Sequence, residues 1–119
     1  MDNETKKIAL FAFNGDVMCF VHVLLNAIDM HENGYDVKVI MEGSATKQIA
    51  ELDDTTKPFS NLYHKVKDLG LFDCVCKACA SKMGALSAAQ EQGLKICDDM
   101  SGHPSARRYF EQGYEILNF

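Results

Sequence analysis

Short apolar runs recur along this chain, and between them lie segments whose apolar residues are spaced three and four apart. The first run, residues 7–13, has no alternation of polar and apolar positions in its core, which is typical of a central strand covered on both faces. Residues 16–33 have helical spacing, and Asp16 is suited to cap the start of a helix. This part of the pattern predicts a buried strand followed by a long helix.

The same pattern continues to the end of the chain. Further strands are predicted at 37–41, 71–76, 94–97 and 114–119, and further helices around Ile49 and Leu52, from Pro58 to 69, at 81–92 and from 103 to 111. Four helical segments end in a glycine, which adopts the left-handed conformation of a helix C-terminus at little cost; these are Gly34, Gly70, Gly93 and Gly113. Strands that alternate with helices through short loops predict an α/β fold with a mostly parallel sheet and helices on both faces. We expect a single domain over residues 1–119.

Composition narrows the classes of function. The net charge of −5 and the scattered basic residues provide no basic surface for nucleic acid. Residues 1–7 are polar, and the apolar stretch after them is shorter than the roughly 20 residues of a membrane span, so we expect neither an export signal nor a span. Five cysteines in such a chain predict free thiols in a reducing cytoplasm.

The richest chemistry lies at the Cys-x-x-Cys pair Cys76 and Cys79, between a predicted strand and a predicted helix. The N-terminus of a helix stabilises a thiolate, so this position favours reactive sulfur. Cys97 and His103 follow the next strand, and the carboxyl ends of parallel strands meet at one edge of a sheet. We therefore expect Cys76, Cys79, Cys97 and His103 at one rim. Cys19 and Cys74, on a helix and within a strand, are predicted to be buried.

Three kinds of chemistry suit a Cys-x-x-Cys pair. Thioredoxin-type redox chemistry is disfavoured here because the pair follows a third strand rather than an early one. Zinc is a second possibility, with Cys76, Cys79, Cys97 and His103 as ligands, although a second closely spaced ligand pair is missing. The third is a carrier thiolate on Cys79 that holds sulfane sulfur as a persulfide. Nearby Lys77 and Lys82 would favour that thiolate.

Other motifs are missing from the sequence. It has no Gly-x-Gly-x-x-Gly, no phosphate-binding Gly-Lys-Ser/Thr loop and no Gly-x-Ser-x-Gly elbow. We therefore predict no nucleotide cofactor, and we assign no resident metal or other cofactor to the cysteine site.

The chain resembles the DsrE/DsrF-like family. The likeness is carried by residues 7–13, the long helix after them, the block 76–84 and the segment 111–117, and it covers about residues 6–119. It implies a three-layer α/β/α fold with a five-stranded, mainly parallel sheet, assembly into trimers or hexamers, and intracellular sulfur transfer between donor and acceptor proteins. The position that matches the family's persulfide cysteine is Cys79.

Cys74, Cys76 and Cys97 are not part of the family motif, which leaves open a disulfide, a metal site or a second acceptor. The sequence thus leads us to expect a cytoplasmic sulfur carrier that uses Cys79, with Cys76 or Cys97 as a resolving or relay thiol. The alternative is a zinc-binding or oligomeric interaction protein of the same fold.

Overall fold

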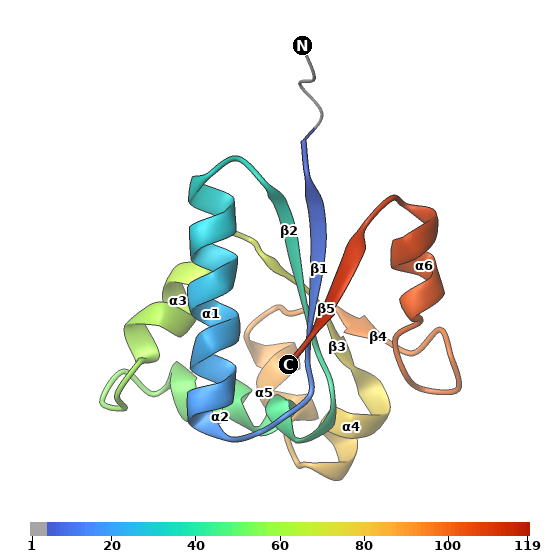
Figure 1. The fold of residues 1–119 in the computed structure, drawn as a ribbon. Coiled ribbons are helices and arrows are strands. Elements are labelled where there is room, and N and C mark those ends of the chain that lie inside the picture. Colours follow the sequence, from blue (N-terminus) through green and yellow to red (C-terminus); the bar gives the residue numbers. More distant parts are fainter. Residues whose placement is uncertain (1–4) are drawn as a thin grey trace.

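A central five-stranded sheet organises the computed structural model, which describes residues 5–119. All neighbouring strands are parallel, in the order β4-β3-β2-β1-β5 (Figure 1). The strands are β1 (Lys7–Ala12), β2 (Asp36–Met41), β3 (Phe72–Cys76), β4 (Ile96–Cys97) and β5 (Glu115–Asn118). The predicted α/β class and the five predicted strands are confirmed, and the sheet is entirely parallel rather than mainly so.

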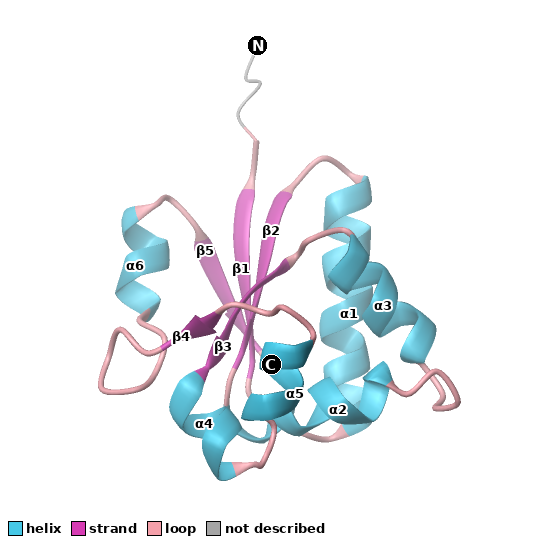
Figure 2. Ribbon diagram, turned by 180° about the vertical axis from the view of Figure 1, so that it is seen from behind, coloured by secondary structure: helices cyan, strands magenta, loops and turns pink. Residues whose placement is uncertain are grey.

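Helices cover both faces of this sheet and give the three-layer α/β/α arrangement. They are α1 (Val17–Glu32), the 3₁₀ turn η1 (Gly43–Lys47), α2 (Gln48–Asp53), α3 (Ser60–Asp68), α4 (Lys77–Lys82), α5 (Leu86–Glu91) and α6 (Ala106–Glu111). Helices α1, α2, α3 and α5 lie on one side and α6 lies on the other, while α4 follows the carboxyl end of β3 (Figures 1 and 2).

Two apolar cores follow from this arrangement. Along β1, Ile8 and Leu10 face the larger core under α1, whereas Ala9 and Phe11 face a smaller core under α6. Alternate side chains of a strand point to opposite faces, so a strand with two buried faces needs apolar residues at every position. This explains the lack of polar alternation in the first strand of the sequence.

The predicted helix at 81–92 is in fact two helices. α4 already begins at Lys77, and a turn with Gly84 at φ 71° separates it from α5. The prediction began too late because the residue before α4 is Cys76, and cysteine is not among the usual capping residues. The last helix begins at Ala106, so His103 lies in the preceding loop rather than at a helix start.

Two further expectations concern α1 and the chain's start. Cys19 is exposed, so its predicted burial is wrong; α1 buries a different face, which includes Phe20, Leu24 and Ala27.

Within residues 5–119, no helix combines the length and the apolar character needed to cross a bilayer. The polar start at 1–7 lies partly outside the described residues, since residues 1–4 are not among them.

Candidate functional site

The turn from β3 into α4 positions the two cysteines of the Cys-x-x-Cys pair. Cys76 ends β3 and is the N-cap of α4, where its Sγ accepts a hydrogen bond from the backbone N–H of Cys79 at 3.4 Å. Cys76 is fully buried, whereas Cys79, in the first turn of α4, is partly exposed. The residue that caps the helix is thus Cys76, and Cys79 is the more accessible thiol.

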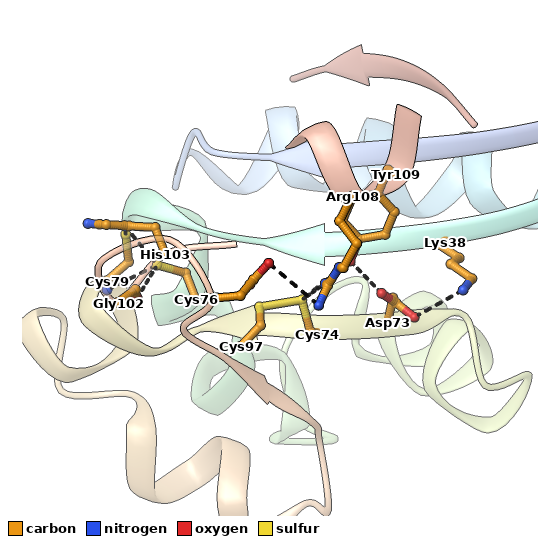
Figure 3. Close-up of a disulfide and its surroundings, with 11 residues drawn as sticks. Lys38, Asp73, Cys74, Cys76, Cys79, Cys97, Gly102, His103, Arg108 and Tyr109 are labelled. Atoms are coloured by element: carbon orange, nitrogen blue, oxygen red, sulfur yellow. Dashed lines mark hydrogen bonds and ion pairs between the residues drawn. A yellow bond between two sulfur atoms is a disulfide. The ribbon is translucent and has the colours of Figure 1, made fainter. Parts of the chain in front are cut away.

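A histidine from the loop after β4 completes the group. Nδ1 of His103 lies 3.1 Å from Cys76 Sγ and 3.8 Å from Cys79 Sγ (Figure 3). The loop is fixed to α4 because the N–H of Ala78 donates to the carbonyl of Gly102 at 2.9 Å. We call Cys76, Cys79 and His103 the thiol–imidazole cluster; their ligand-type atoms lie within 4.8 Å of one another.

Burial controls the charge of the inner thiol. Removal from water raises the pKa of Cys76 to about 11, although the N–H of Cys79 acts in the opposite direction. Burial also raises the pKa of Glu42, an effect that neighbouring His103 opposes. At neutral pH Cys76 therefore carries its proton and faces an imidazole nitrogen that can accept it.

Cys79 lies at an opening in the surface. A cavity of about 480 Å³ is lined by this residue together with Phe13, Gly43, Ser44, Ala78, Lys82, Met83 and His103. Lys82 is thus close to the cavity, as its predicted influence on the thiol requires. Lys77 instead forms an ion pair with Asp98, at 3.7 Å.

Cys97 does not join the cluster, because it is bonded to Cys74 in a disulfide. The expectation of free thiols is therefore wrong for these two residues, and Cys97 is not a free relay thiol in this structure. The cause is the strand register: Cys97 pairs with Cys76 across β3 and β4, and Cys74 lies two residues earlier on the same face of β3. The Cα atoms of Cys74 and Cys97 are 5.7 Å apart, a normal disulfide separation. The predicted burial of Cys74 is confirmed.

Sequence reasoning missed the polar groups around this disulfide. The guanidinium of Arg108 donates through Nη2 to the Tyr109 hydroxyl at 2.9 Å, and the same Nη2 lies 3.8 Å from Cys74 Sγ. The Tyr109 hydroxyl lies 3.5 Å from Cys74 Sγ and donates to Asp73. Arg107, the neighbour of Arg108 on α6, is exposed and pairs with Glu111 instead, and a six-residue helix is too short for its periodicity to reveal this difference between the two arginines.

The thiol–imidazole cluster also offers two sulfurs and a nitrogen of the kinds that bind zinc. The four-ligand set expected from the sequence is incomplete here, since Cys97 is in the disulfide. Within residues 5–119, no further Cys, His, Asp or Glu belongs to this group.

The fold and the cluster define an α/β/α protein with a Cys-x-x-Cys pair and a histidine at the carboxyl edge of a parallel sheet. The chain belongs to the family of the uncharacterized protein MJ0733 of Methanocaldococcus jannaschii, with 35% identity over 97 residues, 82% of this chain and 77% of that protein. Two uncharacterized proteins of Archaeoglobus fulgidus are similar over shorter stretches: 49% identity over 41 residues (34% of this chain, 67% of that protein) and 51% over 37 (31% and 100%).

A solved structure shows the same fold. It is a conserved protein of unknown function, BT1422, from Bacteroides thetaiotaomicron, with a TM-score of 0.73 and 16% identity over 96% of this chain and 95% of that one. No family model matches the chain.

Proposed function

We propose that this protein is a sulfur carrier of the DsrE/DsrF-like kind that holds sulfane sulfur as a persulfide on Cys79. The observation that carries the proposal is the position of Cys79: its thiol is partly exposed at a cavity, in the first turn of α4, with His103 Nδ1 at 3.8 Å. Reactive cysteines are partly exposed and close to basic groups, here His103 and Lys82, whereas inert ones are buried.

The reaction is a transfer of one sulfur atom between thiols. The Cys79 thiolate attacks the outer sulfur of a donor persulfide; a new S–S bond forms on Cys79, the donor's S–S bond breaks, and the donor leaves as a thiolate. An acceptor thiolate then attacks the outer sulfur on Cys79 and releases the Cys79 thiolate. His103 is placed to take up the thiol proton of Cys79 and to return it when the sulfur has left.

A carrier of this kind needs protein donors and acceptors, so the proposal includes such partners, a cytoplasmic setting and assembly into a trimer or hexamer. Phe13 and Met83 support a docking role for the rim of the cavity, because both apolar side chains are exposed there.

The test is mass spectrometry of the reduced protein after incubation with glutathione persulfide. We expect a gain of one sulfur, located by alkylation and tryptic digestion on residues 78–82, a peptide whose single cysteine is Cys79. Cys79→Ser should abolish this gain. Cys19→Ser is the matched control, since Cys19 is a free, exposed cysteine on α1, and it should leave the gain on residues 78–82 unchanged. Sulfur that accumulates only on Cys19, or equally in Cys79→Ser, would refute the carrier role.

Zinc binding is the second candidate function, and the three donors of the thiol–imidazole cluster favour it. Elemental analysis of the purified protein separates the two proposals. About one zinc per chain, lost in His103→Ala, would favour the metal site over the carrier.

A further inference from the structure

The buried disulfide has a charged donor beside one of its sulfurs. Arg108 Nη2 lies 3.8 Å from Cys74 Sγ, and the Tyr109 hydroxyl lies 3.5 Å from it (Figure 3). A sulfur in a disulfide is a weak acceptor and gains little from a guanidinium, whereas a thiolate gains a charge-assisted hydrogen bond. The surroundings of Cys74 therefore suit a thiolate that has been released from the disulfide.

The other charged groups near Cys74 leave the Arg108 guanidinium free to donate a hydrogen bond to a Cys74 thiolate. Arg108 uses Nη1 for its ion pair with Asp99, at 3.7 Å, so the two N–H groups of Nη2 can serve the Tyr109 hydroxyl and Cys74 Sγ. The nearest carboxylate on β3 is Asp73, which accepts from Tyr109 and pairs with Lys38 at 3.5 Å. Lys38 thus offsets the negative charge that would oppose a Cys74 thiolate.

The strand register gives Cys97 a second possible partner. Cys97 on β4 is the register partner of Cys76 on β3, and adjacent strands lie about 4.8 Å apart. Disulfides span Cα separations of about 4.4–6.8 Å, so Cys97 is within reach of Cys76 as well as of Cys74. Cys76 in turn lies beside Cys79 in the thiol–imidazole cluster, with their sulfurs within 4.8 Å. The four cysteines form a continuous series from the core to the cavity.

We propose that this protein is a thiol–disulfide exchanger in which the disulfide migrates along this series, from Cys74–Cys97 through Cys76–Cys97 to Cys76–Cys79. The activity goes beyond the sulfur-carrier function and does not depend on it. The surface disulfide then oxidises a dithiol substrate, a small molecule or a protein, which leaves Cys76 and Cys79 as thiols.

The migration needs no external oxidant. His103 takes the proton of Cys76, and the Cys76 thiolate attacks Cys97 Sγ; the Cys74–Cys97 bond breaks, and its electron pair leaves on Cys74 beside Arg108. The Cys79 thiol then releases its proton to water and attacks Cys76 Sγ. The Cys76–Cys97 bond breaks, and Cys97 leaves with the proton held by His103. One disulfide is present before and after, so no electrons are gained or lost.

The experiment maps the disulfide in the full-length chain. The protein is equilibrated in glutathione buffers to form the Cys74–Cys97 bond and is then freed of glutathione. It is held anaerobically at pH 9, where exchange proceeds faster than at neutral pH because more thiolate is present. The sample is then quenched in acid, alkylated and digested with trypsin. Cys74 and Cys76 share the peptide 68–77, Cys79 lies in 78–82 and Cys97 in 96–107. We expect 68–77 to become linked to 78–82, with alkylated Cys97. In Cys79→Ser the migration should stop at Cys76–Cys97, which fragmentation distinguishes from Cys74–Cys97.

Arg108→Gln tests the released thiolate, with Arg107→Gln as the matched control, since Arg107 is exposed and pairs with Glu111. Loss of one charge-assisted hydrogen bond should lower the ratio of migrated to original disulfide about tenfold in Arg108→Gln and leave it unchanged in Arg107→Gln. The proposal is overturned if the disulfide stays at Cys74–Cys97 in both the wild type and Cys79→Ser, or if the Cys74–Cys97 disulfide forms in none of the glutathione buffers. It is also overturned if Arg108→Gln and Arg107→Gln have the same ratio of migrated to original disulfide. This experiment contains no sulfane donor, so a negative result would refute disulfide migration without refuting the proposal that Cys79 carries a persulfide.

Discussion

Reduction of the Cys74–Cys97 disulfide should destabilise the folded protein by an amount that follows from its position in the chain. The bond joins residues 23 apart in the sequence and closes one loop between β3 and β4. The entropy that such a loop removes from the unfolded chain corresponds to about 3 kcal/mol at 25 °C. For 119 residues, an unfolding entropy of about 250 cal/mol/K at the melting temperature converts this into a decrease in Tm of about 12 °C.

Urea denaturation at neutral pH, with and without a phosphine reductant, measures this difference in the free energy of unfolding. Cys97→Ala is the control, because it lacks the disulfide and should be insensitive to the reductant. A change of less than about 1 kcal/mol in the wild type, or an equal change in Cys97→Ala, would refute the reasoning that this bond constrains the unfolded chain.

Two further predictions concern Gly15 and Cys76. A Cβ at Gly15 would lie 2.5 Å from the backbone oxygen of Ser44, so Gly15→Ala should destabilise the protein by about 2 kcal/mol in thermal denaturation, and an unchanged Tm would contradict this. Burial raises the pKa of Cys76 to about 11, so the folded state keeps a proton that the unfolded chain releases from about pH 9. This contribution to stability is complete below pH 9 and is lost as the pH rises to 11. The free energy of unfolding should therefore decrease less steeply between pH 9 and 11 in Cys76→Ala than in the wild type, and equal slopes in the two proteins would contradict this prediction.

Local patterns in the sequence were sufficient to predict the strands and helix ends. Each predicted strand lies within about two residues of the observed one, and Gly34, Gly70, Gly93 and Gly113 all have φ between 72° and 88°. These features depend on neighbouring residues, so a single sequence contains them.

The parts of the site that were not predicted depend on contacts between distant segments. By contrast, the position of Cys76, Cys79 and His103 at one rim of the sheet could be predicted, because it depends only on the strands being parallel. The disulfide required the exact register of β3 against β4, which no local pattern encodes. The inward turn of Arg108 depended on Tyr109 and Asp73, which meet only in the folded chain.

The short edge strand β4 gives the disulfide a mechanical consequence. β4 pairs with β3 through only two residues, and the loop that follows it carries His103. Short ladders at a sheet edge open locally at low free energy, and a covalent cross-link suppresses that opening. When the cross-link is cleaved, amide hydrogen exchange should therefore accelerate first in β4 and residues 98–103, so the imidazole becomes mobile while the central strands stay protected.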